Sequence, residues 1–408
     1  MNNAAIHQKC AFYLDKLCRQ IPDRSVGSPG NREATRFFEE QIASLGWITA
    51  SQEFDALDWH AGDALLAAGG LEFEVLPSPY ANGCDVEGRL VGVENIRELE
   101  VAAITGKIVL LHGEIAGEQL MPKNFVFYNP EEHQRIIALL ESGQPLAIVC
   151  ATGRNPALAG GVYPFPLIED GDFDIPSVYM TAEEGARLRS CLGQTVRLRS
   201  DSRRIPGKGW NVTARQGSLS GRRVVVTAHI DAKKGTPGAI DNATGVAVLL
   251  LLAELLSDYR GQTMVEIVAF NGEDYYAVPG QMLYLQRNQD QFDEVLLNVN
   301  IDGAGYCDGS SAYSFYDLPE QMEQIARAEF GSFAGLMPGE PWYQGDHSIF
   351  VQAGRPAIAI TSAWFAENIE NQDITHTPKD NLAIVDVSRV VEIAQALATF
   401  VRALDAAA

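Results

Sequence analysis

The feature that most constrains the fold of this chain is a regular alternation of short apolar runs and helix-patterned segments from Gly221 onward. Short apolar runs are typical of buried strands, and apolar positions at helical spacing are typical of helices that pack on a sheet. The alternation predicts an α/β architecture around a mostly parallel mixed sheet, flanked by helices. The expected strands are 222–230, 263–271, 295–301 and 356–362, and the expected helices are 242–259, 277–287, 320–330 and 387–404.

The part of the chain before Gly221 has a different pattern of apolar and polar residues. Helical patterns at 4–20 and 31–45 are expected to belong to the same domain as the alternating half. A chain of 408 residues exceeds the size at which single cores usually stop growing. We therefore predict a discontinuous domain, 1–71 with 204–408, and a smaller inserted β-rich α+β domain at 72–203. Its expected strands are 107–112, 146–150 and 177–180, and its expected helices are 131–142 and 182–191.

Charge and apolar content exclude several classes of partner. The chain has 53 acidic and 31 basic residues and a formal net charge of −22, a balance that repels nucleic acids and anionic membranes. The longest apolar stretch, 246–253, is too short to span a bilayer, and residues 1–18 resemble no secretory signal. Six widely spaced cysteines suit a reducing compartment, and we expect buried thiols. These features predict a cytoplasmic protein, whose oligomeric state the sequence does not indicate.

Polar runs follow the predicted strands, which is where α/β sheets usually bind ligands. Each run taken alone has a structural explanation: a histidine at a strand end is more often structural, an aspartate before a helix is more often an N-cap, and adjacent acids are more often an exposed loop. The runs are Ala228-His229-Ile230-Asp231, the glycine-rich 235–245 with Asp241, Asn271-Gly272-Glu273-Asp274, Asn300-Ile301-Asp302 and Thr375-His376-Thr377.

Together, these runs offer five oxygen or nitrogen ligands and one spare carboxylate at the strand ends of one sheet. That combination is what two divalent metal ions require. Carboxylate and imidazole ligands without thiolates suit zinc, while cobalt or manganese remain open alternatives. Within the first run, Asp231 could orient the second ring nitrogen of His229.

In their order and spacing, these runs resemble peptidase family M28, a family of metallopeptidases that includes bacterial aminopeptidases and glutamate carboxypeptidases. The resemblance covers about 221–381 and, through 28–33, extends more weakly to the N-terminal helices. It implies a zinc-exopeptidase fold of the phosphorylase/hydrolase-like kind, and the inserted segment looks like a protease-associated domain. The matching runs are His229-Ile230-Asp231, Gly238-Ala239-Ile240-Asp241-Asn242, Gly272-Glu273-Asp274, Asn300-Ile301-Asp302, Gly345-Asp346-His347 and Thr375-His376-Thr377.

The resemblance also implies a role for each matching residue. One metal ion would be held by His229 and Asp302, the other by Asp274 and His376, and Asp241 would bridge the two. The remaining roles are Glu273 as general base, Asp231 as the carboxylate that orients His229, and a cis peptide bond between Asp241 and Asn242. Apart from these roles, Asp346 with His347 beside it is a candidate to contact the substrate, and Tyr343 or Trp342 could line that side of the site, although core packing explains either aromatic residue equally well.

The sequence departs from the family pattern at two positions. Asp274 stands where many relatives have glutamate, and Gly345 stands where the family usually has serine. The first change shortens a ligand, and the second removes a hydroxyl donor that could stabilise an oxyanion.

The implied function is a dinuclear zinc exopeptidase acting on peptide substrates. An aminopeptidase is favoured, because no cluster of basic residues flanks the motifs to hold a substrate carboxylate. The alternatives are a carboxypeptidase or dipeptidase of the same family, a single-zinc glutaminyl cyclase, and a catalytically inactive binding module. Retention of both His229 and Asp302 favours two metal ions over one, and the complete ligand set beside Glu273 argues against a pure binder.

Overall fold

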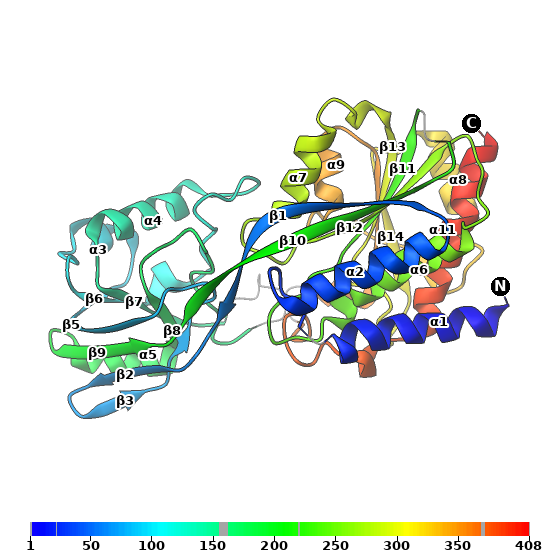
Figure 1. Cartoon of the computed structure of the whole chain (residues 1–408). Coiled ribbons are helices and arrows are strands. Elements are labelled where there is room, and N and C mark those ends of the chain that lie inside the picture. The colour runs from blue at the N-terminus through cyan, green and yellow to red at the C-terminus, as the bar shows by residue number, and fades with distance from the viewer. Residues whose placement is uncertain (1, 22, 155–161, 219–220, 369–371, 408) are drawn as a thin grey trace. The chain divides into compact units, whose positions relative to one another are not determined.

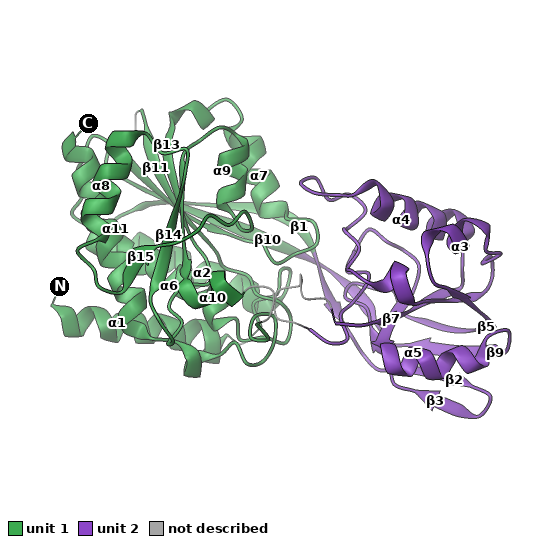
Figure 2. Ribbon diagram, turned by 180° about the vertical axis from the view of Figure 1, so that it is seen from behind, with its two compact units in different colours: residues 1–56, 208–408 green, residues 57–207 purple. Residues whose placement is uncertain are grey.

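The computed structural model describes residues 2–21, 23–154, 162–218, 221–368 and 372–407. The chain forms two compact units, 1–56 with 208–408 (unit 1) and 57–207 (unit 2), shown in Figure 2. The inserted unit thus begins earlier than the predicted boundary at 72. The reason is that β2 (Ala64–Ala68) pairs with β9 (Thr195–Ser200), which ties the residues after 57 to the inserted sheet.

Unit 1 is built on an eight-stranded sheet in the order β1-β10-β12-β11-β13-β16-β14-β15. The pairs among β12, β11, β13 and β16 are parallel, whereas β10 and β14 run antiparallel to their neighbours β12 and β16. The predicted α/β fold with a mixed sheet is therefore confirmed. The strands are β1 (Ile48–His60), β10 (Arg203–Gln216), β11 (Arg223–His229), β12 (Met264–Phe270), β13 (Val295–Ile301), β14 (Ser311–Tyr316), β15 (Leu336–Pro338) and β16 (Ala357–Ser362).

Five helices and the sheet build the large core on one face (Figure 1). Successive residues of a strand point to opposite faces of the sheet, so Val224, Val226 and Ala228 of β11 all point into this core. Helix α6 is almost entirely apolar and buried, because it packs against both the sheet and the outer helices α1 and α11. The helices are α1 (Asn3–Asp15), continued by the π-helical turn η1 (Lys16–Gln20), α2 (Pro29–Ser44), α6 (Thr244–Leu255), α8 (Glu320–Phe330) and α11 (Val387–Ala407).

The opposite face is covered by an aromatic cluster. The ring of Phe270 on β12 lies 5.2 Å from that of Tyr284 on α7, and Tyr284 lies 5.7 Å from Phe350 on α9. These contacts hold α7, which follows β12, and α9, which precedes β16, on this face of the sheet. The elements on or beside this face are α7 (Pro279–Asn288), η5 (Phe292–Glu294) and α9 (His347–Gln352); α10 (Ala363–Asn368) and η6 (Leu382–Ile384) lie later in the chain.

Unit 2 has its own eight-stranded sheet, in the order β3-β2-β9-β5-β6-β7-β8-β4. Two apolar clusters hold it together, one containing residues of α4 and the other residues of α5. All the expected strands and helices of this segment are present, with further strands that the sequence did not predict. The remaining elements are β3 (Leu71–Phe73), β4 (Leu76–Pro77), β5 (Cys84–Val93), α3 (Ile96–Val101), β6 (Ile108–Leu111), η2 (Gly113–Ala116), α4 (Glu131–Gly143), β7 (Ala147–Thr152), β8 (Ser177–Thr181), α5 (Ala182–Leu188) and η3 (Arg189–Cys191).

The six cysteines are all free thiols. Four are buried as predicted, but Cys84 is only half-buried and Cys307 is exposed. Burial was the wrong expectation for Cys307 because it lies in the loop between β13 and β14 rather than in an element of the core. Within the described ranges, no helix has the length and apolar character needed to cross a membrane.

Candidate metal centre

The central strands bring most of the predicted site residues to one edge of the unit 1 sheet. His229 is the last residue of β11, residues 271–274 follow β12 directly, and Asp302 follows β13. Because β11 is parallel to both neighbours, the carboxyl ends of all three strands lie at the same edge. The register places His229 opposite Phe270, so the histidine lies beside the start of the loop that carries Glu273 and Asp274.

Asp241 reaches this edge from η4 (Ala239–Ala243), the turn before α6. Its backbone is not helical, with φ −119° and ψ 83°, and the peptide bond to Asn242 is cis, as the resemblance implies. The Asn242 side chain donates to the carbonyl oxygen of Ile301 at 2.8 Å and accepts from the Gly245 amide at 3.0 Å. Asn242 thereby ties the Asp241 turn to the end of β13, next to Asp302.

The five predicted metal ligands converge around the Asp241 carboxylate. One of its oxygens, Oδ1, lies 3.1 Å from His229 Nε2, and the other, Oδ2, lies 3.2 Å from His376 Nε2. His229 Nε2 is also 3.4 Å from Asp302 Oδ1, and His376 Nε2 is 2.9 Å from Asp274 Oδ1. Asp241 thus stands between two imidazole and carboxylate pairs, the arrangement expected of a bridging ligand.

The chemistry of this donor set fits divalent metal ions. Neither ring nitrogen of His229 makes a hydrogen bond, although the residue is only 1% exposed, and Asp274 Oδ2 is likewise buried without a hydrogen-bond partner. Buried polar atoms nearly always have such partners. Ligand atoms of His229, Asp241 and Asp274 lie within 4.8 Å of one another, a grouping that could hold a metal ion.

The electrostatics of the centre favour positive charge between the acids. Burial by itself lowers the pKa of His229, but the nearby carboxylates, foremost Asp302, raise that pKa well above its ordinary value. Burial lowers the pKa of His376 as well, but Asp274 and Asp241 raise it by more. The pKa of His376 therefore also lies well above its ordinary value. Burial raises the pKa of Asp241, yet the two imidazoles together lower it below its ordinary value. The carboxylates therefore stabilise cations at this place in the fold.

Glu273 lies in an environment that favours its protonated form. Burial, followed by the negative charges of Asp274, Asp302 and Asp346, raises the pKa of Glu273 well above its ordinary value, and His229 only partly opposes this. A carboxylate with a raised pKa accepts a proton more readily, as a general base must.

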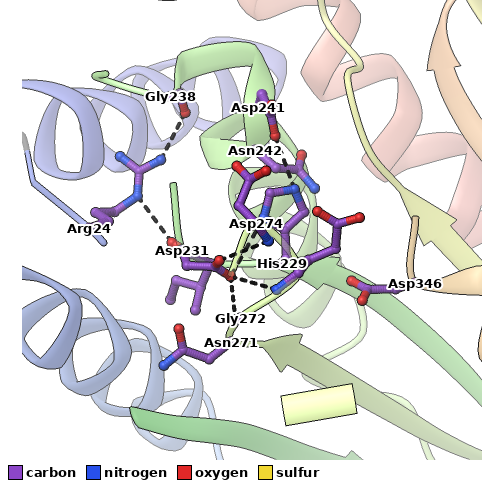
Figure 3. Close-up of polar contacts among 12 residues, drawn as sticks. Arg24, His229, Asp231, Gly238, Asp241, Asn242, Asn271, Gly272, Asp274 and Asp346 are labelled. Atoms are coloured by element: carbon purple, nitrogen blue, oxygen red, sulfur yellow. Dashed lines mark hydrogen bonds and ion pairs between the residues drawn. The ribbon is translucent and has the colours of Figure 1, made fainter. Parts of the chain in front are cut away.

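Asp231 organises the loop of Glu273 and Asp274, as Figure 3 shows. Its Oδ1 accepts the amides of Gly272 at 2.6 Å and Glu273 at 3.3 Å, and its Oδ2 accepts the amide of Asp274 at 3.1 Å. The distance from Oδ1 to His229 Nδ1 is 3.7 Å, too long for a hydrogen bond. In this structure, its main contacts are therefore with the loop rather than with the histidine that the sequence assigned to it.

Replacing Asp231 with asparagine is expected to weaken the binding of Zn²⁺ by about 10–100-fold. An amide group would turn a donor toward one of the backbone N–H groups that Asp231 now accepts. The measurement is zinc affinity by chelator competition. Asp290→Asn, at an exposed aspartate of the same unit, is the matched control and should behave like the wild type. Wild-type zinc affinity in Asp231→Asn would contradict this role.

Of the three residues predicted to contact the substrate, two are buried and one is exposed. Asp346 and His347 are completely buried, and each contacts protein: Asp346 accepts from Gln281 at 2.6 Å, and His347 Nε2 lies 2.8 Å from the carbonyl oxygen of Trp342. Both lie at the start of α9, which packs on the sheet, and Asp346 Oδ2 and His347 Nδ1 are buried there without a hydrogen-bond partner. Tyr343 is 72% exposed and packs its ring 5.6 Å from that of Tyr316.

Two buried charged residues near the centre were not predicted. Asp380 is fully buried and accepts the backbone amides of Ile240 and Asp241. Arg24 is 1% exposed and donates to four backbone carbonyls, among them Ile230 and Gly238 (Figure 3). Asp380 closes the polar run that begins at Thr375, so that run was a usable signal, whereas nothing local in the sequence marks Arg24.

An α/β sheet that gathers imidazoles and carboxylates at its strand ends is suited to bind divalent metal ions there. Residues 211–401 match the model of peptidase family M28. Over this segment, which is slightly less than half of the chain, the protein resembles the M28 peptidases.

Curated relatives are similar at low identity. The probable lipoprotein aminopeptidase LpqL of Mycobacterium tuberculosis is 24% identical over 319 residues, which are 75% of this chain and 59% of the relative. Aminopeptidase YwaD of Bacillus subtilis is 24% identical over 241 residues, 55% of this chain and 50% of the relative. The chain therefore spans between half and two thirds of the length of these relatives.

Solved structures share the fold. The aminopeptidase from Aneurinibacillus sp. strain AM-1 superposes with a TM-score of 0.75 at 21% identity, over 97% of this chain and 93% of that protein. Porphyromonas gingivalis glutaminyl cyclase superposes with a TM-score of 0.53 at 13% identity, over 98% of both chains. At these identities, the likeness concerns the fold alone.

Proposed function

We propose that this protein is a dinuclear zinc aminopeptidase that removes N-terminal residues from peptides. The observation that carries the proposal is the Asp241 carboxylate, whose two oxygens lie 3.1 and 3.2 Å from the imidazoles of His229 and His376. A carboxylate shared in this way, with one further acid beside each imidazole, is suited to hold two metal ions side by side.

The residues divide into ligands and a proton carrier. His229 and Asp302 would hold one zinc ion, Asp274 and His376 the other, and Asp241 both. Bound zinc lowers the pKa of water and polarises a carbonyl oxygen. Glu273 is not needed as a ligand, so its carboxylate takes the proton from the attacking water and delivers it to the amine that leaves. Its raised pKa supports both transfers, because the group must accept the proton and then hold it.

The choice of an aminopeptidase rests on charge and on the relatives. A substrate ammonium group is attracted to a centre rich in carboxylates, whereas a substrate carboxylate would need a basic cluster that the motifs lack. Proteins similar to this chain, LpqL and YwaD among them, carry the name aminopeptidase. The alternative with a single zinc, a glutaminyl cyclase, shares the fold.

Metal content and substrate choice test the proposal together. We expect about two zinc ions per chain, with hydrolysis of dipeptides that have a free amino terminus and no hydrolysis of their N-acetylated forms. Elemental analysis and a panel of free and blocked dipeptides provide both readouts. Cleavage of blocked peptides would point to a carboxypeptidase or endopeptidase, and cyclisation of N-terminal glutamine with one zinc would point to a glutaminyl cyclase. A chain that binds no metal firmly would refute the proposal.

A further inference from the structure

The loop that carries His376 also holds the turn that carries Asp241. Asp380 is completely buried, and its carboxylate accepts the amide of Ile240 at 2.7 Å and that of Asp241 at 3.1 Å. The backbone carbonyl of Asp380 accepts the amide of Ala239 at 3.3 Å. One residue therefore binds three successive amides at the start of η4.

A second connection joins the same two segments nearby. The hydroxyl of Thr236 donates to the carbonyl oxygen of Thr377 at 3.0 Å, and it accepts the amide of Gly238 at 3.1 Å. Thr377 is the neighbour of His376, so this hydroxyl links the segment before Asp241 to the segment around the second histidine. The two ligand-bearing segments are thus joined at two points.

Arg24 holds the carbonyl side of the same turn, as Figure 3 shows for Gly238. Its guanidinium donates to the carbonyls of Pro237 and Gly238, both at 2.8 Å, and to that of Ile230 at 3.1 Å. The buried guanidinium of Arg24 thus fixes the carbonyls that precede Asp241, and the buried carboxyl group of Asp380 fixes the amides that lead into it.

We propose that Asp380 is a positioning residue for the bridging carboxylate of Asp241, a role that rests on the proposed two-metal site. Asp241 has a backbone outside the helical region, so no regular helical pattern of hydrogen bonds holds it. Its orientation must nevertheless be narrow, since each oxygen faces a different imidazole. The carboxylate of Asp380 supplies the missing constraint, and groups that orient a ligand in this way typically change metal affinity 10–100-fold when they are replaced.

A purely structural role for Asp380 is the competing explanation. A second buried acid of unit 1, Glu266, provides a control that distinguishes the two explanations. Glu266 is fully buried on β12 and accepts from Arg215 at 2.6 Å and from Tyr284 at 2.7 Å. Its position near the start of β12 puts it at the other end of the strand from the Glu273 loop. Loss of its charge should affect stability without affecting the metal site.

The test compares Asp380→Asn with Glu266→Gln as the matched control. Asparagine keeps the shape but turns an amide donor toward a backbone N–H. For metal-free protein, we expect Asp380→Asn to bind Zn²⁺ about 10–100-fold more weakly than the wild type in chelator competition. Its Co²⁺ absorption spectrum should also be altered, because the ligand geometry changes. Glu266→Gln should show wild-type zinc affinity and a wild-type Co²⁺ spectrum, whatever its melting temperature.

Folded Asp380→Asn with wild-type zinc affinity and a wild-type Co²⁺ spectrum would overturn the inference while leaving the two-metal proposal intact. If Asp380→Asn does not fold, Thr236→Val takes its place, since it removes only the hydroxyl that bridges the two segments. It should weaken zinc binding in the same direction, and unchanged affinity would again overturn the inference. A wild-type chain that binds no zinc would instead refute the proposed function, and this inference with it.

Discussion

Glu273→Gln is expected to retain its bound zinc and to lose about 10²–10⁴-fold in kcat/KM, the contribution of a well-placed general base. Glutamine preserves the size of the side chain but cannot accept the proton of the attacking water. Burial and the acids around Glu273 raise the pKa of its carboxyl group, which suits this residue to accept a proton.

The interpretation depends on metal content measured on the same sample. Glu266→Gln is the matched control, since it neutralises a buried glutamate associated with the same strand, β12, without touching the centre. Its activity should stay within a small factor of the wild type. Turnover close to the wild type in Glu273→Gln, with zinc occupancy unchanged, would exclude Glu273 as the base.

Asp241→Asn should lose firmly bound metal at both positions, whereas His376→Ala should lose about one of two ions. The difference arises because Asp241 faces both imidazoles while His376 faces only Asp241 and Asp274. Asparagine offers one oxygen and no negative charge, so it cannot satisfy two cations at once.

Elemental analysis after dialysis against a weak chelator measures both variants. Asp290→Asn, at an exposed position of the same unit, is the control for loss of one negative charge. Two ions retained in Asp241→Asn would rule out a bridging role, and unchanged stoichiometry in His376→Ala would remove His376 from the ligand set.

These expectations trace back to patterns that are local in the chain. Buried parallel strands have continuous apolar runs, so β11, β12, β13 and β16 could be located, and with them the edge where the polar runs meet. Strands such as β1 and β10 were missed because no continuous apolar run marks them. Most residues of β1 are partly buried or exposed, and the buried stretch of β10, 211–214, mixes polar with apolar residues.

The same limit applies to the burial of two residues predicted to contact substrate. Asp346 and His347 follow a glycine in a polar loop, which in sequence resembles a binding loop. The structure buries both because α9 packs its first turn against the sheet, a long-range contact with no local sequence pattern.

The sequence by itself determined the fold class, the edge of the sheet that carries the site, and the residue types gathered there. Each of these depends on periodicity or on a polar run beside an apolar one. Only the tertiary structure decided that Asp241 lies between His229 and His376, which are far apart in the chain. Only it revealed that Asp380 and Arg24 hold the Asp241 turn. Such contacts arise from packing between distant segments, and a buried charge that binds backbone groups can come from any segment that reaches them.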